Sequence, residues 1–375
     1  MTCRGLPILA AVALALLAAP GASAETAQPA AVPSSFTIRN LGAFPGDYSG
    51  DAAGINNWGD AVGYSLTDDF VNFVPVRPVL FANRQVFRFH SLPYEPPGFD
   101  RGSAVAINDE GVAVGTVFAA KGPTHAAQFA PSATSDLGTV LPDGNSYATG
   151  INNRGQVVGY ADAVLGENGI LTHAVRYAGG KVIDLGVLPG GSYSYATGIN
   201  DQGVAVGYAT TATGSLHAVS FANGQIADLG VPPGGSSSMA LGINNQGQAV
   251  GSADFGTGAS HAALFANGTI TDLGTLPGGA NSVATAINNL GQAVGWSDNG
   301  TGFSRPVLFV RGQVIDLGTF AGITNAYPAA INDLGQVVGT VELAISPDPD
   351  LQRTLGVMWT PAAQAIMPRQ VTGTR

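Results

Sequence analysis

The sequence contains a single cysteine, Cys3, and only 11% of its 375 residues are charged. Cys3 lies in a predicted secretory signal, so we expect the mature chain to have neither disulfides nor cysteine metal ligands. No later run approaches the ~20 apolar residues that a transmembrane helix needs. The net charge of −10 argues against nucleic-acid binding, which relies on Lys and Arg to neutralise phosphates.

The first residues have the three parts of a signal peptide. Arg4 supplies positive charge, residues 6–19 are apolar, and Ala22-Ser23-Ala24 is a small-residue cleavage site. We therefore predict a signal peptide over residues 1–24, cleaved near Ala24, and a secreted or periplasmic protein. A linker at 25–34, one domain at 35–369 and a tail at 370–375 complete the predicted organisation.

One phrase, [GA]-I-N-[ND]-x-G, occurs seven times. Its isoleucines are separated by 52, 44, 48, 44, 44 and 44 residues, and they are Ile55, Ile107, Ile151, Ile199, Ile243, Ile287 and Ile331. Two further phrases recur between these copies, namely Asp-Leu-Gly and His-Ala. A near-constant period of this size indicates a repeat architecture.

Each unit reads as four short strands. In residues 146–152, SYATGIN, small and larger side chains alternate with the period of a strand. Asn152-Asn153-Arg154-Gly155 is a hairpin turn signal, and the chain returns through QVVGYA at 156–161. HAVRYA at 173–178 and KVIDLG at 181–186 form a second hairpin around Gly179-Gly180.

Four strands in about 44 residues are typical of a β-propeller blade. The sequence therefore predicts an all-β fold, a seven-bladed β-propeller built from four-stranded repeats. The small side chains of the first strand suit the crowded axis of such a ring. Residues 35–42, SFTIRNLG, resemble a lone fourth strand, which predicts that the first strand completes the last unit.

These phrases resemble those of the HAF-repeat family of bacterial extracellular repeat proteins. The resemblance depends on DLGTLPGG at 272–279, GINNQGQAVG at 242–251 and His261-Ala262, and it extends over nearly the whole mature chain. In this sequence Val or Ala replaces the Phe of the family's phrase. The resemblance implies export and a repeat architecture, and it implies no activity.

A basic residue and an aspartate recur eleven positions apart. These pairs are His125 and Asp136, His173 and Asp184, His217 and Asp228, His261 and Asp272, and Arg305 and Asp316. An acid–base or metal-binding role would suit His and Asp, but a catalytic site is normally unique. Arg also replaces His once, which an ion pair tolerates and a metal ligand does not. We interpret the pairs as structural.

The repeated asparagine after each isoleucine has two interpretations. Seven amides could form a ligand-binding ring at one end of a central channel, or each could cap its own turn, and we favour the cap. No motif for catalysis, nucleotide binding or calcium binding is present. We therefore predict no catalytic, cofactor-binding or metal-binding residues and no cofactor.

Departures from the repeat are better candidates for function, because binding residues tend to lie on loops carried by a rigid scaffold. The first unit is stretched to 52 residues and concentrates aromatic and cationic side chains: Phe87, Arg88, Phe89, His90, Tyr94, Phe99 and Arg101. Loops at 65–76 and 344–353 add acidic and aromatic groups. If the ring closes as expected, these three loops lie near its seam.

The leading functional prediction is an exported, non-enzymatic propeller, a monomer, that binds an extracellular protein or glycan through inter-strand loops. A lectin would need repeated aromatic platforms, whereas the tyrosines and the tryptophans Trp58, Trp296 and Trp359 look scattered. A propeller hydrolase or lyase acting on carbohydrate would need one unrepeated cluster of carboxylates or histidines. Both remain alternatives, since fold alone does not decide function.

Overall fold

The computed structural model describes residues 32–33, 35–66, 76–90, 92, 101–118, 122–130, 133–166, 169–344 and 354–362. Its compact unit spans Val32–Arg375. The predicted signal peptide and the tail at 370–375 lie outside the described residues. Within the described residues, no helix has the length and apolar character to cross a membrane.

The described secondary structure consists of strands alone, and they form six sheets. Five sheets have four antiparallel strands in chain order. The first two are β6 (Gly102–Ile107), β7 (Ala113–Phe118), β8 (Thr124–Ala130) and β9 (Ala133–Asp136), then β10 (Ser146–Ile151), β11 (Val157–Gly166), β12 (Gly169–Ala178) and β13 (Lys181–Asp184). The third is β14 (Ser194–Ile199), β15 (Ala205–Thr210), β16 (Leu216–Ala222) and β17 (Gln225–Gly230). The other two are β18 (Ser238–Ile243), β19 (Ala249–Asp254), β20 (Ser260–Ala266) and β21 (Thr269–Gly274), then β22 (Ser282–Ile287), β23 (Ala293–Asp298), β24 (Ser304–Val310) and β25 (Gln313–Asp316).

The sixth sheet has eight strands and contains both ends of the described chain. Its strands are β1 (Phe36–Asn40), β2 (Ser49–Ile55), β3 (Ala61–Leu66), β4 (Val76–Ala82), β5 (Gln85–Arg88), β26 (Ile323–Ile331), β27 (Val337–Leu343) and β28 (Thr354–Pro361). A single parallel pair, Gly50 with Leu355, connects β2 to β28. β1 pairs antiparallel with β28, from Phe36 opposite Pro361 to Asn40 opposite Val357. The expected pairing of the first strand with the last unit is therefore present.

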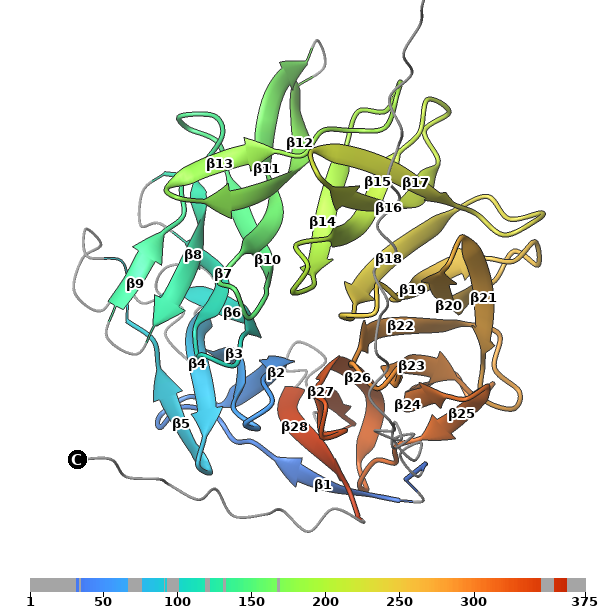
Figure 1. Cartoon of the computed structure of the whole chain (residues 1–375). Coiled ribbons are helices and arrows are strands. Elements are labelled where there is room, and N and C mark those ends of the chain that lie inside the picture. Colours follow the sequence, from blue (N-terminus) through green and yellow to red (C-terminus); the bar gives the residue numbers. More distant parts are fainter. Residues whose placement is uncertain are drawn as a thin grey trace, which may run out of the picture. The chain divides into compact units, whose positions relative to one another are not determined.

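The sheets stand around a central axis with their first strands innermost (Figure 1). This radial arrangement of four-stranded antiparallel sheets is that of a β-propeller, which confirms the prediction of an all-β propeller. The core is correspondingly divided into clusters between neighbouring sheets. In one of them Val114 of β7 packs with Val157 and Val175 of the next sheet, and all three are buried.

Glycine on each second strand permits the close pairing with the innermost strand. A β-carbon added at Gly159 of β11 would lie 1.8 Å from the carbonyl oxygen of Tyr147, and one added at Gly207 would meet Tyr195 at the same distance. The ladders shift register beside these glycines, between Ala148 and Gly150 in β10. Only glycine fits this β-bulge geometry.

Candidate functional site

The Asn-x-x-Gly turn between the first and second strands of each unit follows from its residue types. Gly155 has a φ of 70°, a left-handed conformation that glycine adopts without cost. The amide of Gly155 donates to the carbonyl of Asn152. The Asn152 side-chain oxygen accepts from the amides of Arg154 and Gln156 at 3.0 and 2.9 Å. The other six turns show the same pair of bonds, which confirms the turn-cap interpretation.

The asparagine amide nitrogen forms a bond that the sequence did not predict. In every turn it donates to the backbone carbonyl of the equivalent asparagine in the next turn, over 2.8 to 3.2 Å. The last bond runs from Asn332 to Asn56, across the ends of the chain. All of the side chains are 3% or 4% exposed, and they are Asn56, Asn108, Asn152, Asn200, Asn244, Asn288 and Asn332. We call this set the asparagine ring.

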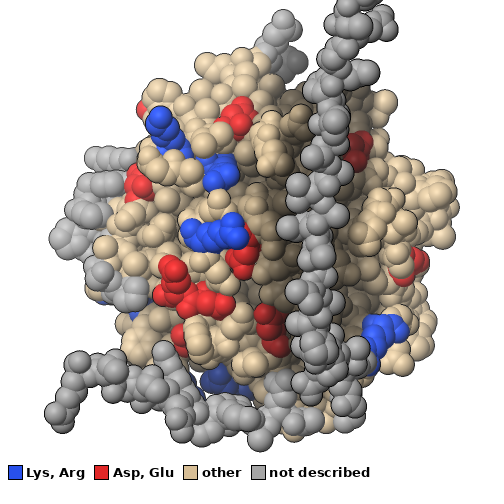
Figure 2. Space-filling model, viewed as in Figure 1, with Lys and Arg blue, Asp and Glu red and all other residues tan. Residues whose placement is uncertain are grey.

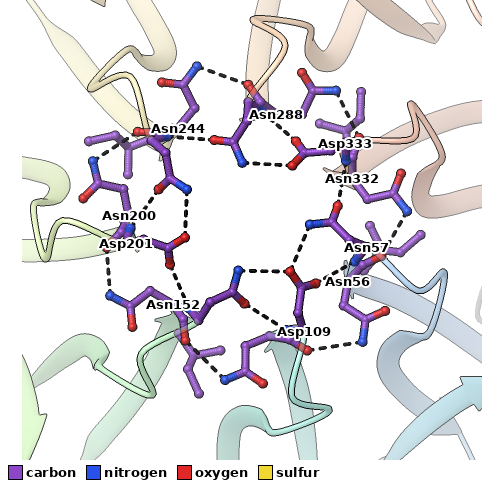
Figure 3. Close-up of a pocket in the computed structure, with 18 of the residues that line it drawn as sticks. Asn56, Asn57, Asp109, Asn152, Asn200, Asp201, Asn244, Asn288, Asn332 and Asp333 are labelled. Carbon is purple, nitrogen blue, oxygen red and sulfur yellow. Dashed lines mark hydrogen bonds between the residues drawn. The ribbon is translucent and has the colours of Figure 1, made fainter. Parts of the chain in front are cut away.

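The next residue of each turn forms a second cycle of hydrogen bonds. Its side-chain oxygen accepts from the backbone amide of the preceding turn at 2.8 or 2.9 Å, and the members are Asn57, Asp109, Asn153, Asp201, Asn245, Asn289 and Asp333. These residues line a polar cavity of about 160 Å³ on the axis (Figure 3). The second cycle contributes three carboxylates and four amides to the cavity wall, beside the asparagine ring and the repeated isoleucines.

The three carboxylates are already occupied by donors within the protein. Asp109 accepts from the side-chain amides of Asn57 and Asn153, both at 3.0 Å. Asp201 accepts from the side-chain amide of Asn245 at 2.8 Å, and Asp333 accepts from that of Asn289 at 3.0 Å. Across the described ranges, His, Cys, Asp and Glu nowhere gather in threes that could hold a metal ion. The contacts of both cycles join one sheet to the next.

The predicted basic–acidic pairs are close in space. Histidine Nδ1 lies 2.7 or 2.8 Å from an aspartate oxygen in all four His–Asp pairs, and the Arg305 Nε lies 3.0 Å from Asp316. The second oxygen of each aspartate accepts from the glycine amide two residues later, as in Asp228 with Gly230 at 2.7 Å. Each aspartate thus joins the third strand to the turn that ends the fourth.

The aromatic and cationic segment of the first unit is divided by the structure. Phe87 and Arg88 are exposed on β5, the outermost strand of its sheet, and His90 is exposed just beyond it. Phe89 is 5% exposed and packs against Phe129 at 5.2 Å, so it is not available to a partner. Arg101 is partly buried at the start of β6. Tyr94, Phe99 and most of the loops at 65–76 and 344–353 lie outside the described residues.

The structure also assembles four tyrosines that looked scattered in the sequence. The Tyr147 ring stacks on Tyr160 at 4.7 Å, Tyr160 meets Tyr195 edge-on at 5.0 Å, and Tyr195 stacks on Tyr208 at 5.0 Å. We call these four residues the tyrosine array. Burial raises the pKa of the Tyr160 phenol to about 12, with smaller effects from the neighbouring phenols.

A register count could have found the tyrosine array. Tyr147 and Tyr195 both lie four residues before the repeated isoleucine, and Tyr160 and Tyr208 both lie nine residues after it. Trp296 occupies that second position in another unit, so these four tyrosines and Trp296 follow the repeat although they look scattered in the sequence. Trp359 is fully buried, and its indole nitrogen donates to the Gly318 carbonyl at 3.0 Å.

The family comparison corrects the sequence-based assignment. The family model that matches is "Protein of unknown function (DUF3466)", over residues 45–169. The assignment to the HAF-repeat family is therefore wrong. Its phrases contain the turn asparagines, the turn glycines and the paired aspartates that this hairpin geometry requires, so they identify the repeat rather than a family. No curated protein matches the sequence.

Solved structures resemble this chain at low sequence identity. A puromycin-hydrolysing peptidase from Mycobacterium tuberculosis is 10% identical with a TM-score of 0.52, over 86% of this chain and 54% of the peptidase. This chain therefore spans about half the length of that protein. The β-propeller domain of the Trilobed protease from Pyrococcus furiosus (10% identity, TM-score 0.44) covers 73% of this chain and 99% of the domain. TolB from Acinetobacter baumannii (11%, 0.43) covers 81% and 80%.

Proposed function

We propose that the chain is an exported, seven-bladed β-propeller that binds an extracellular or periplasmic partner through its inter-strand loops, without catalysis. The blade number is supported by the asparagine ring, whose seven members bond in one closed cycle. Each half of the eight-stranded sheet then counts as one blade, with β1 as the fourth strand of the last one. Export is supported by the signal-like residues 1–24.

The observation that carries the binding function is the distribution of exposed apolar side chains. Loops between second and third strands, and those that lead to a new first strand, leave the same end of each antiparallel sheet. Six large apolar side chains are exposed on these loops, and they are Val164, Leu165, Ile170, Tyr193, Phe303 and Phe320. We call this end of the molecule the loop end. The turns at the opposite end expose three such side chains, Trp58, Leu290 and Leu334. Exposed apolar surface marks interaction sites, and the loop end has more of these side chains.

The β11–β12 hairpin is the most prominent of these loops. Both strands have ten residues, whereas most of their counterparts have six or seven, and the ladder continues to Gly166 opposite Gly169. Leu165 is 76% exposed and Ile170, its partner across the ladder, is 49% exposed. Figure 2 shows that most of the face it presents is uncharged, with several acidic and basic side chains next to one another on its left part. Such a surface suits an apolar or weakly polar partner.

Binding to envelope preparations of the producing organism tests this function. We expect the double variant Leu165→Ser, Ile170→Ser to lose at least roughly fivefold in retention on immobilised envelope, since two apolar contacts of about 1 kcal/mol each are removed. Ile183→Ser is the matched control, because Ile183 is 45% exposed on the outer strand of the same sheet. Equal retention of both variants contradicts the proposal.

Phe87 and Arg88, on the outer strand β5, form a second candidate surface, which we call the rim. Phe87 is 44% exposed, and the guanidinium of Arg88 lies over the Phe44 ring at 5.7 Å. Phe87→Ser in the same assay separates this outer edge from the loop end. If only Phe87→Ser reduces retention, the partner contacts the rim rather than the β11–β12 hairpin.

A further inference from the structure

The repeat contains two positions at which the seven units differ while their neighbours stay the same. The residue four before the repeated isoleucine is, in chain order, Asp51, Ser103, Tyr147, Tyr195, Met239, Val283 and Tyr327. The residue paired with it on the second strand is Tyr64, Thr116, Tyr160, Tyr208, Ser252, Trp296 and Thr340. The position after the first of these is alanine in six units and proline in the seventh.

This set of fourteen residues, which we call the variable belt, lies at the loop end. Its first-strand members are separated by four residues from the isoleucines that border the asparagine ring, about 13 Å of extended chain. A position needed only to close the ring keeps its residue type, as the asparagine does in all seven units. The side chains of the variable belt are therefore free of the closing role. Asp51, Thr116 and Ser252 are buried, and the partly exposed members are available for recognition.

Four consecutive members of the variable belt form the tyrosine array, across the sheets that contain β10 and β14 (Figure 1). All four side chains are partly buried, so their rings keep an accessible edge or face. Within the part of the chain that the structure describes, the Tyr177 hydroxyl donates to the Tyr147 carbonyl, whereas none of the four array hydroxyls has a hydrogen-bond partner. None of these hydroxyls is fully buried either. They therefore face water or a ligand.

We propose that the tyrosine array is a binding site for a neutral saccharide. The faces of the phenol rings are electron-rich and accept the C–H face of a sugar ring. Unpaired phenol hydroxyls provide donors and acceptors for sugar hydroxyls. The array contains no acidic or basic residue, and a protein with a net charge of −10 repels acidic glycans. Neutral saccharides combine these apolar and hydroxyl surfaces without charge.

This inference goes beyond the loop-mediated binding proposed above, because it concerns residues of the inner two strands. Isothermal titration of the full mature chain with cellohexaose, maltohexaose and chitohexaose tests it, with an oligogalacturonate as the acidic comparison. We expect binding of at least one neutral oligosaccharide and none of the acidic one. Failure of all three neutral probes to bind at about 10 mM, where even an affinity near −3 kcal/mol is detected, overturns the proposal.

Phenylalanine variants separate binding from packing. Tyr160→Phe with Tyr195→Phe keeps both rings and removes two hydroxyls, so we expect roughly 10- to 100-fold weaker binding at an unchanged Tm. Tyr327→Phe is the matched control, since it occupies the same repeat position in another sheet, beside Trp296. If the double variant binds as the wild type does, the array only packs the fold and the proposal is wrong. Leu165→Ser, Ile170→Ser leaves saccharide binding intact, so the two proposals fail separately.

Discussion

At the residue scale, two residues of each unit, the turn asparagine and the second-strand glycine, fix the geometry of the turns and strands. The turn asparagine Asn152 forms four hydrogen bonds in a nearly inaccessible position, three within its own turn and one to the next sheet. The second-strand glycine leaves no room for a β-carbon. Both residues occur in every unit because the backbone geometry requires them.

The second-strand glycine is predicted to tolerate no side chain. In Gly159→Ala the new methyl group would lie 1.8 Å from the Tyr147 carbonyl oxygen, so the strands must separate. We expect the free energy of unfolding to fall by about 3 kcal/mol or more. Chemical denaturation measures this change. Gly179→Asn is the matched control, because Gly179 has a φ of 59° and asparagine stands at the equivalent Asn223 and Asn267. An unchanged midpoint for Gly159→Ala contradicts the steric argument.

Two substitutions at one asparagine separate its turn cap from its bond to the next sheet. Asn152→Asp keeps an oxygen for the amides of Arg154 and Gln156 but places a second oxygen beside the Asn200 carbonyl, 2.8 Å from the present nitrogen. Asn152→Ala removes all four bonds of this side chain, including the one to the Gln156 side-chain oxygen. We expect the unfolding free energy to fall by about 1 to 3 kcal/mol in either variant, because each leaves buried polar groups unpaired.

Hydrogen exchange identifies which bond is lost. Asn152→Asp should leave the turn amides of Arg154 and Gln156 protected, whereas Asn152→Ala should expose them. Equal protection in both variants would show that the cap contributes nothing to the turn.

At the element scale, the third and fourth strands are joined by the basic–acidic pairs. We predict that Asp228→Ala lowers the unfolding free energy more than His217→Ala, by about 1 kcal/mol, because Asp228 also accepts from the Gly230 amide. His217→Arg should stay within about 0.5 kcal/mol of the wild type, as Arg305 occupies this position in another sheet. Thermal denaturation gives this order, and a larger loss for His217→Arg than for His217→Ala would oppose the structural role.

We predict that the tyrosine array makes the free energy of unfolding depend on pH in the alkaline range. Burial raises the folded pKa of Tyr160 to about 12, above the value near 10 of an unfolded tyrosine. Between these values the unfolded chain loses a proton that the folded chain keeps, so the unfolding free energy falls as pH rises from about 10 to about 12. Denaturation across this range measures the slope, which should be smaller in Tyr160→Phe. An identical slope in that variant would place the effect on other tyrosines.

At the scale of the whole molecule, the ring closes through two separate devices. The asparagine ring joins the last turn to the first through Asn332 and Asn56, and β1 pairs with β28 at the outer part of the same sheet. Both join residues from the two ends of the described chain. Because β1 pairs with β28, the strand edge that an open sheet would expose at this point is paired.

Removal of β1 should open the last sheet. Without residues 32–40, the edge of β28 loses its partner, and Ile38 no longer packs against the cluster around Trp359. We expect a lower Tm and concentration-dependent self-association, because an unpaired strand edge recruits other chains. Light scattering at several concentrations measures this effect. A variant that stays monomeric with an unchanged Tm would show that the asparagine ring alone closes the molecule.

Much of the fold could be predicted because local residue types specify it. The alternation of SYATGI, the Asn-x-x-Gly turn and the regular spacing of the isoleucines each follow from backbone chemistry within a few residues. The candidate site could be predicted only in part. Phe89 looked like a binding residue but packs against Phe129, and the sequence carries no local signal for that contact across two sheets.

The sequence by itself determined the strands, their turns and the repeat, because these depend on φ preferences and on side-chain alternation within one unit. Only the tertiary structure decided which residues of different units meet. The bond from each asparagine to the next turn joins residues 44 to 52 positions apart, or 276 where the ring closes. The edge-on contact of Tyr160 with Tyr195 likewise joins two different units. Such contacts depend on the angle and distance between sheets, which the packing of the whole ring sets.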